Sequence, residues 1–241
     1  MSTLSGKVAI VTGGSRGIGL AAARLLRREG ASVAVVGTNS AHLRTAVDTL
    51  TSDEAAGRVE AVAADVRDSG QMEAAMARTA SALGGIDIVI NNAGVGIFKP
   101  VAEMSVDEWR LMFDTNITGI FNTSRAALPY LRARGGGWVI NVSSLSGTNP
   151  FPGGAAYCAT KAAVNAFSEA FMQEVRHDGI RVAYVSPGSV DTSFGGGTRD
   201  KSGWALQPED VAQVIGDLVA YPGRSLPSRV EIRPSRPPRK G

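Results

Sequence analysis

Short apolar runs alternate with amphipathic stretches along most of the chain. Runs rich in β-branched residues predict strands at residues 7–12, 32–36, 59–63, 86–91, 138–142, 181–186 and 229–232. The stretches between them carry apolar residues at helical spacing and predict helices at residues 17–29, 41–50, 71–83, 106–134, 155–177 and 208–221.

The predicted strands have almost no polar face, as in the run from Val8 to Val11. A strand that is apolar on both sides is typical of a parallel sheet covered by helices on both faces. Alternation of strands and helices therefore predicts the α/β class, a doubly wound, Rossmann-type parallel sheet of about seven strands with helices on both faces. Ligands in such folds bind at the carboxyl ends of the strands, so the polar residues that follow the strands are the candidate site.

Length and composition fit one soluble domain spanning residues 1–241. The hydrophobic content of 44% and the charged content of 20% are ordinary for a globular protein. No apolar run reaches the ~18 residues of a membrane-spanning helix. The first residues lead directly into a strand without the features of a signal peptide, and the single cysteine favours a reducing compartment. We therefore expect a cytoplasmic protein.

The basic character of the chain is concentrated near its C-terminal end. From Arg224 onward there are six cations and one anion, a local charge of +5, whereas the whole chain carries +3. No aromatic residue that would stack on a base lies in this stretch. We interpret the Pro/Arg-rich tail from about residue 234 as disordered and solvated, and expect no nucleic-acid partner. Contact with a polyanion is the alternative.

A glycine-rich turn, TGGSRGIG at residues 12–19, follows the first predicted strand. Its glycines allow a tight turn and let a pyrophosphate approach the backbone at a helix N-terminus. The spacing G-x-x-x-G-x-G between a buried strand and a helix predicts a dinucleotide site. The candidate residues in this turn are Gly13, Ser15, Arg16, Gly17, Ile18 and Gly19.

The residues after the second predicted strand indicate which dinucleotide binds. NAD sites usually place an acid there to hold the ribose diol, but this chain has Thr38 and Asn39 and no acid up to His42. Arg16 is suited to a 2′-phosphate. The sequence therefore favours NADP over NAD. The alternative is a solvated Arg16, with Thr38 or Asn39 accepting either cofactor.

Tyr157 and Lys161 are four residues apart on a predicted helix, and Ser144 lies thirteen residues before Tyr157. Residues at this spacing share one helix face. At about 5 Å and an effective dielectric of about 20, an ammonium would stabilise a phenolate by roughly 3 kcal/mol. This predicts a Tyr157 pKa lowered by roughly two units and proton exchange near neutral pH. Taken alone, the pair also fits a half-buried aromatic beside a solvated amine.

These motifs, in this order, resemble those of the short-chain dehydrogenase/reductases, in their ordinary single-domain branch and specifically the 3-oxoacyl carrier-protein reductases. The similarity runs from about residue 7 to residue 191. Its pieces are the glycine-rich turn, Asp65-Val66, Asn91-Asn92-Ala93-Gly94, Asn116, Ser144, Tyr157 with Lys161, and Pro187-Gly188 followed by Thr192.

The resemblance implies four catalytic residues. Tyr157 would be the general acid in carbonyl reduction and the base in alcohol oxidation, and Ser144 would donate a hydrogen bond to the carbonyl oxygen. Lys161 would lower the Tyr157 pKa and hold the nicotinamide ribose. Asn116 would hold a water that relays protons to Lys161. No cluster of residues with metal-ligand spacing is found, so we expect no metal.

The resemblance also implies a cofactor cleft. Asp65 and Val66 would contact the adenine, and Pro187 and Gly188 would shape the nicotinamide pocket. The further cofactor-binding candidates are Thr38, Asn39, Asn92, Ala93, Gly94, Tyr157, Lys161, Val190 and Thr192.

Two regions depart from the family pattern. Residues 191–208 form a short stretch with Gly195-Gly196-Gly197, which we expect to be mobile and to leave the site open. The chain end lacks the family's glycine-rich finish, although a homodimer or homotetramer is still expected. Substrate candidates are mostly apolar and suit a lipophilic ketone or aldehyde: Val95, Ile97, Phe98, Leu145, Phe151, Val190, Phe194 and Trp204.

The sequence thus predicts an NADP-dependent oxidoreductase that interconverts a small-molecule carbonyl compound, a ketone or aldehyde, and the corresponding alcohol. One alternative is a 3-oxoacyl thioester reductase acting on a carrier-protein or CoA substrate, with Arg132, Arg134 and Arg176 as carrier contacts. Helix-dipole complementation explains these cations without any partner. A second alternative is a non-catalytic dinucleotide-binding module, which would not need the four catalytic candidates.

Overall fold

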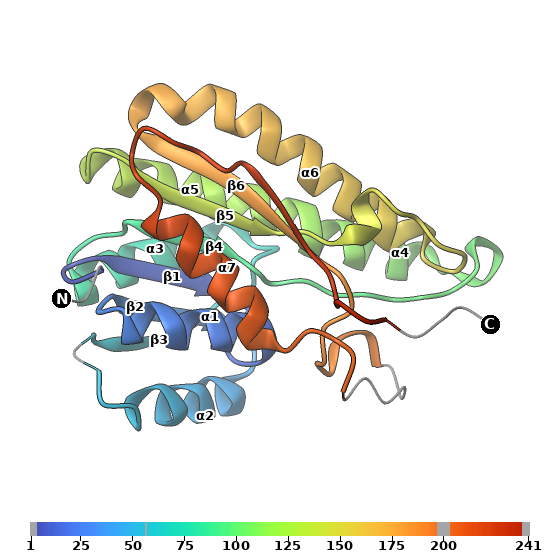
Figure 1. Ribbon diagram of the computed structural model, residues 1–241, viewed down its shortest axis with the longest axis horizontal. Coiled ribbons are helices and arrows are strands. Elements are labelled where there is room, and N and C mark those ends of the chain that lie inside the picture. The colour runs from blue at the N-terminus through green and yellow to red at the C-terminus, as the bar shows by residue number, and fades with distance from the viewer. Residues whose placement is uncertain (1–3, 56, 197–202, 238–241) are drawn as a thin grey trace.

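A parallel sheet of seven strands forms the centre of the computed structural model, which describes residues 4–55, 57–196 and 203–237 (Figure 1). Every neighbouring pair is parallel, and the order is β3-β2-β1-β4-β5-β6-β7. The strands are β1 Val8–Thr12, β2 Ser32–Gly37, β3 Val59–Ala63, β4 Ile88–Asn91, β5 Gly137–Val142, β6 Ile180–Pro187 and β7 Arg229–Ile232. The predicted fold class is confirmed.

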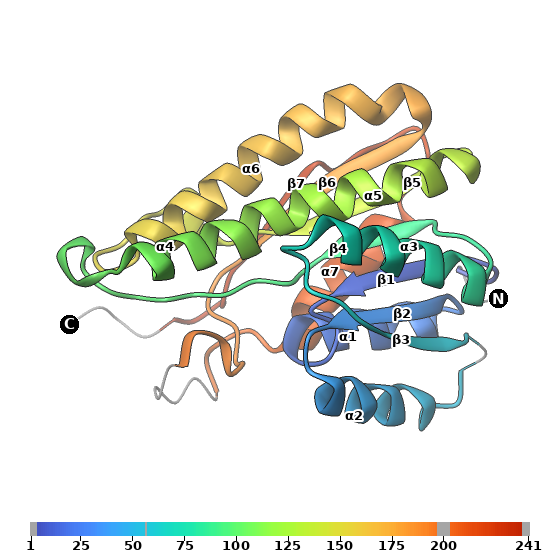
Figure 2. The same cartoon turned by 180° about the vertical axis from the view of Figure 1, so that it is seen from behind.

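Helices cover both faces of the sheet (Figures 1 and 2). They are α1 Gly17–Arg28, α2 Ser40–Thr51, α3 Ser69–Leu83, α4 Val106–Phe113, α5 Gly119–Ala133, α6 Ala155–Val175 and α7 Pro208–Ala220. One apolar cluster joins α1, α2 and α7 to one face, and a second joins α3, α5 and α6 to the other. No helix in the described part of the chain is long and apolar enough to cross a membrane.

The order of connection positions the site. The chain first builds β1, β2 and β3 outward on one side, then returns to the centre to add β4 beside β1. Loops after β1 and β4 therefore leave the same edge in opposite directions and open a crevice between them. The segments after β1, β4, β5 and β6 all carry candidate residues.

The predicted helix at residues 106–134 is wrong in one respect. It is divided into α4 and α5 by a π-helical segment, Asp114–Thr118. A π segment contains an extra residue per turn and is frequent at functional sites. It turns Asn116 fully inward, so this amide is completely buried.

The basic C-terminal region is more ordered than its composition predicts. Arg229 in β7 pairs with Glu169 at 2.7 Å, and Gly188 N donates to Ile232 O at 2.8 Å. Pro234 packs against Gly188, because a Cβ on that glycine would lie 2.9 Å from Pro234 Cδ. Pro234 thus contacts the domain, whereas the solvated tail from about residue 234 stays a prediction, and its last four residues, 238–241, lie outside the described part.

Candidate active site

A cleft of about 1250 Å³ opens at the carboxyl ends of the strands. This volume exceeds the roughly 300–1,000 Å³ of most small-molecule pockets, and so leaves room for a dinucleotide together with a substrate. The predicted residues that line it are Gly13, Ser15, Arg16, Gly17, Ile18, Thr38, Asn39, Asp65, Val66, Asn92, Ala93, Gly94, Ser144, Tyr157, Lys161, Pro187, Gly188, Val190 and Thr192. Two predicted residues, Gly19 and Asn116, lie behind the cleft surface.

The glycine-rich turn is fastened to the loop after β4. Gly13 and Gly17 have φ of 61° and 54°, a region that favours glycine. A Cβ on Gly13 would lie 2.9 Å from Ala93 Cα, so only glycine lets the two loops approach this closely. The Asn92 amide donates to Thr12 O and Gly13 O, both at 3.1 Å. Gly19 is also required for this close packing, because a Cβ added at Gly19 would clash with Gly13 O.

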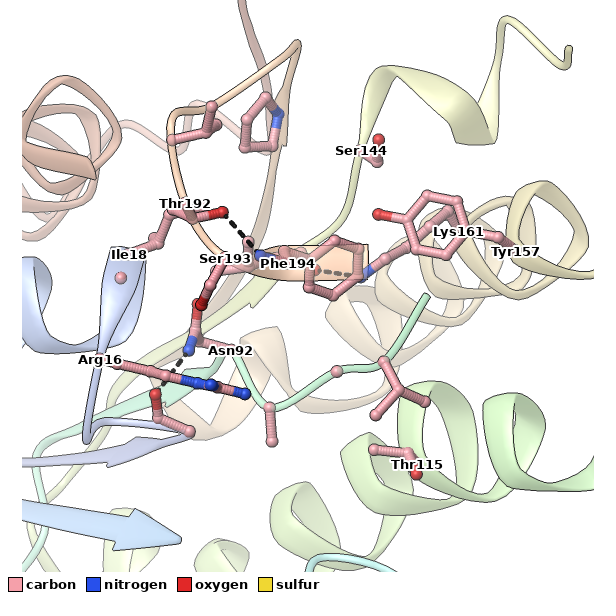
Figure 3. Close-up of a pocket in the computed structure, with 18 of the residues that line it drawn as sticks. Arg16, Ile18, Asn92, Thr115, Ser144, Tyr157, Lys161, Thr192, Ser193 and Phe194 are labelled. Carbon is pink, nitrogen blue, oxygen red and sulfur yellow. Dashed lines mark hydrogen bonds between the residues drawn. The ribbon is translucent and has the colours of Figure 1, made fainter. Parts of the chain in front are cut away.

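Helix α1 begins with its N-terminal N–H groups turned to this cleft. Its N-cap, Arg16, is extended and makes no side-chain capping bond. The first-turn N–H groups are therefore left for an acceptor from outside the helix, which is how helix N-termini bind phosphate. The Arg16 side chain projects into the cleft (Figure 3).

The loop after β2 combines a helix cap with part of the cleft wall. Asn39 caps α2, its Oδ1 accepting from His42 N at 2.9 Å. His42 also lines the cleft, and it was not among the predicted site residues. Its place in the first turn of the helix after β2 was the available signal, because that turn faces the same crevice as the glycine-rich loop.

Asp65 and Arg67 form a close ion pair on the cleft wall after β3. Arg67 Nη2 lies 2.5 Å from Asp65 Oδ2, and this guanidinium holds the pKa of the carboxyl below its usual value. The Asn122 amide donates to Val66 O at 3.0 Å and so fixes the loop from behind. Arg67 is a second cleft residue that sequence reasoning missed.

Asn116 joins three parts of the site from underneath. Its Oδ1 accepts from Val95 N at 2.8 Å, and its Nδ2 donates to Val95 O at 2.9 Å and to Thr160 Oγ1 at 3.0 Å. Thr160 in turn donates to Tyr157 O at 2.8 Å. These bonds position the loop after β4 against α6. The water-holding role that the resemblance implies stays a prediction.

Tyr157 stands on the first turn of α6 with only 8% of its surface exposed. Burial raises the pKa of its phenol to about 12, because the phenolate loses its hydration. A hydrogen bond with Ser144 opposes this rise, and the neighbouring Cys158 adds to it. The predicted lowering of the Tyr157 pKa is therefore wrong for the protein as the structure describes it.

The position of the Lys161 amine explains why it does not lower the pKa of Tyr157. Its Nζ lies 5.8 Å from the centroid of the Tyr157 ring and donates to Val142 O at 2.9 Å. The amine is thus directed at the end of β5 rather than at the phenol oxygen. Burial also lowers the pKa of Lys161 to about 8, because the ammonium loses its hydration.

Ser144 lies two residues after the end of β5 and caps the short helix at Leu145–Gly147. Its Oγ accepts from Ser146 N and donates to Ser146 Oγ, both at 3.1 Å. The Ser144 side chain and the Tyr157 hydroxyl face the same part of the cleft (Figure 3). The thirteen-residue spacing therefore brings two hydroxyl groups to one point, as the sequence predicts.

The substrate end of the cleft is apolar. Six of the eight predicted substrate residues line it: Val95, Phe98, Leu145, Phe151, Val190 and Phe194. Ile97 instead packs in a small core with Met112, and Trp204 lies away from the cleft wall. Phe194 contacts Tyr157 with ring centroids 5.7 Å apart, and the openness of the site at this segment stays a prediction. Gly197 of the predicted glycine run lies outside the described residues.

Fold and site together define a dinucleotide-dependent oxidoreductase of the doubly wound α/β class, and comparison with known proteins identifies its family. The model of the short chain dehydrogenase family matches residues 7–203. A protein of Staphylococcus aureus (strain USA300), described as an uncharacterized oxidoreductase, is 34% identical over 97% of this chain and 100% of its own. The chain belongs to the short-chain dehydrogenase family.

Solved structures show the same architecture. A metagenomic short-chain oxidoreductase in complex with NADP is 35% identical, with a TM-score of 0.85 over 98% of this chain and 100% of its own. A 3-ketoacyl-ACP reductase from Sinorhizobium meliloti 1021 is 33% identical, with a TM-score of 0.85 over 94% of this chain and 97% of its own.

Proposed function

We propose that this protein is an NADP-dependent oxidoreductase that reduces a ketone or aldehyde to an alcohol, or oxidises the alcohol, with Tyr157 as the proton-transferring group. One observation carries the proposal. The Tyr157 and Ser144 hydroxyls meet at one end of a single cleft, whose other end is formed by the glycine-rich turn with Arg16. The NADP complex of the metagenomic relative supports the choice of cofactor.

The residues present fit a bound NADP. The uncapped N-terminus of α1 and the turn at Gly13 would receive the pyrophosphate, and Arg16 would receive the 2′-phosphate. Asp65 and Val66 would lie beside the adenine, and Lys161 would hold the ribose next to the nicotinamide. When bound, the reduced cofactor supplies the hydride.

The protein's own residues supply the proton. With a pKa of about 12, the Tyr157 phenol is protonated throughout the neutral range, which is the form needed to protonate a carbonyl oxygen as it becomes an alkoxide. The Ser144 hydroxyl can donate a hydrogen bond where that negative charge develops. A protonated Tyr157 therefore suits carbonyl reduction near neutral pH.

A screen of carbonyl compounds followed by NADPH absorbance tests this function. Ketones, aldehydes and acetoacetyl thioesters would be offered with NADPH, and turnover of at least one class is expected. Tight NADPH binding without turnover of any class would contradict the proposal and support a binding module instead.

The thioester alternative has one observation in its favour, the similarity to a structure described as a 3-ketoacyl-ACP reductase. The arginines proposed to contact a carrier protein give this alternative little support. Arg132 pairs with Asp178 at 2.7 Å, and Arg134 pairs with the buried Asp87 at 3.0 Å, so both cations already serve this chain. In the same screen, an acetoacetyl thioester reduced faster than every free ketone would favour the alternative.

Replacing Arg16 with alanine should weaken NADPH binding selectively. A hydrogen bond to a charged group contributes about 1.5–3 kcal/mol, so KM for NADPH should rise by about 10- to 150-fold while KM for NADH changes little. Arg44, an exposed cation on α2 that does not line the cleft, gives the matched control Arg44→Ala. Equal effects of Arg16→Ala on the two cofactors would refute a 2′-phosphate contact.

A further inference from the structure

Three phenylalanine rings form a cluster with Tyr157, two in contact with it and the third, Phe151, in contact with Phe98, and they come from three separate parts of the chain. Phe98 follows β4, Phe151 precedes α6, and Phe194 lies after β6. Ring centroids are 5.3 Å apart for Phe98 and Tyr157, 5.7 Å for Phe194 and Tyr157, and 5.8 Å for Phe98 and Phe151. Tertiary folding, rather than local sequence, brings these rings together.

Each of the three rings is held from behind by a glycine. The pairs are Phe194 on Gly96, Phe98 on Gly195 and Phe151 on Gly154, and in each pair a Cβ on the glycine would lie 2.6 Å from a ring carbon. On the side of each glycine, the backbone therefore lies against the ring and leaves no room for one more carbon. We call these three rings, Phe98, Phe151 and Phe194, the wall.

The other side of this wall is open. Phe98, Phe151 and Phe194 are 43%, 41% and 38% exposed, although each contacts another ring, and all three line the cleft. Tyr157 at the centre is only 8% exposed. Because apolar surface in a cleft favours an apolar occupant, the three rings mark the place of the substrate's hydrophobic part.

The charges of the cleft lie elsewhere. Four charged or titratable side chains come from the glycine-rich turn and from the segments after β2 and β3: Arg16, His42, Asp65 and Arg67. Apart from Tyr157, the others that line the cleft are Asp191, an anion, and Lys161, whose amine donates a hydrogen bond to Val142 O. Among the described residues, the aromatic end thus lacks a further cation that would receive a carboxylate or phosphate on the substrate.

We propose that the substrate is a neutral ketone or aldehyde that bears an aryl group, whose ring packs among Phe98, Phe151 and Phe194 while its carbonyl oxygen meets Tyr157 and Ser144. This inference rests on the proposed carbonyl reduction. The wall rings are tilted at interplanar angles of 47°, 54° and 76° to their neighbours. Tilted and edge-to-face contacts at about 4.5–7 Å are the arrangement that aromatic rings prefer, so a substrate ring would extend the cluster.

A matched pair of ketones tests the aromatic preference. Phenylacetone and cyclohexylacetone have the same unconjugated carbonyl and nearly the same shape, but only the first has an aromatic ring. With NADPH, kcat/KM for phenylacetone should exceed that for cyclohexylacetone by about tenfold, the expected effect of one or two aromatic pairs.

Variants locate this preference on the wall. Phe98→Leu, Phe151→Leu and Phe194→Leu keep apolar volume without the ring, and each should reduce the aryl preference several-fold. Gly96→Ala, which pushes Phe194 from its place, should also reduce it. Phe121, an exposed aromatic on α5 outside the cleft, gives the control Phe121→Leu, which should keep the wild-type ratio. Thermal unfolding verifies that each variant is folded.

The results separate this inference from the proposed function. A wild-type ratio near one overturns the aryl preference even when both ketones are reduced. A ratio that all the wall variants leave unchanged overturns the placement of the substrate ring among Phe98, Phe151 and Phe194. If neither ketone is reduced, calorimetry on the NADPH complex measures their affinities. An aryl preference in binding then supports the wall although the proposed function fails, and equal or undetectable binding overturns it.

Discussion

Replacing Tyr157 with phenylalanine should lower kcat for carbonyl reduction by about 10²- to 10⁴-fold, the usual contribution of a positioned general acid. The variant keeps the ring, and with it the contacts to Phe98 and Phe194, and loses only the hydroxyl. Binding of NADPH and of a ketone should therefore change little. The measurement is kcat and KM with the best ketone from the screen, together with NADPH affinity.

A second buried tyrosine provides the control. Tyr184 in β6 is 7% exposed and does not line the cleft, so Tyr184→Phe removes a buried hydroxyl without touching the proposed chemistry. Its kcat should stay within about twofold of the wild type. If Tyr157→Phe reduces ketones as fast as Tyr184→Phe does, Tyr157 is not the proton donor.

The pKa of Tyr157 gives this prediction a pH dependence. Because the phenol ionises only at about pH 12, reduction should lose no activity to Tyr157 deprotonation between about pH 6 and about pH 9. A tyrosine acidified by Lys161 would instead lose its proton, and reductive activity, near pH 8. Alcohol oxidation, which needs the deprotonated form, should accelerate as the pH rises.

Local pattern determined the parts of this structure that sequence reasoning predicted correctly. A run such as Val8–Thr12 has no polar face, so it belongs in a covered parallel sheet. Gly13 and Gly17 have left-handed φ angles, which is why their spacing was informative. Both features depend on residues that are neighbours in the chain.

The features that were missed depend on long-range packing or on side-chain direction. Apolar spacing does not distinguish the π segment around Asn116 from a continuous helix, because the two differ by one residue in a turn. Spacing places Lys161 near Tyr157, yet burial and the acceptor at Val142 decide where the amine points. Phe194 meets Tyr157 only because Gly96, far away in sequence, leaves room for its ring.

The buried amine of Lys161 predicts a conflict between stability and function. Replacing it with methionine should stabilise the fold by about 1–3 kcal/mol at pH 7, because a charged lysine in this site costs more than an apolar chain of similar length. Loss of the hydrogen bond to Val142 O offsets part of this gain, by about 1 kcal/mol. Activity should fall by about 100-fold or more, since the residue would no longer hold the cofactor ribose.

The sign of the pH effect makes this prediction specific. Folded protein releases the Lys161 proton near pH 8, whereas the ordinary value of 10.5 applies to the unfolded chain. Between these values the unfolded state binds more protons, so rising pH stabilises the wild type through Lys161 but has no such effect on Lys161→Met. Urea unfolding at about pH 7 and about pH 9.5 should therefore show the advantage of the variant shrinking as the pH rises.

Lys99 supplies the matched comparison. It is 43% exposed and pairs with Glu108, so its ammonium keeps its hydration and Lys99→Met should bring no gain in stability at either pH. If Lys161→Met is less stable than the wild type at pH 7, or if its advantage grows with pH, the Lys161 amine is not held at a cost in the folded state. The conclusion that burial lowers the pKa of Lys161 would then be wrong.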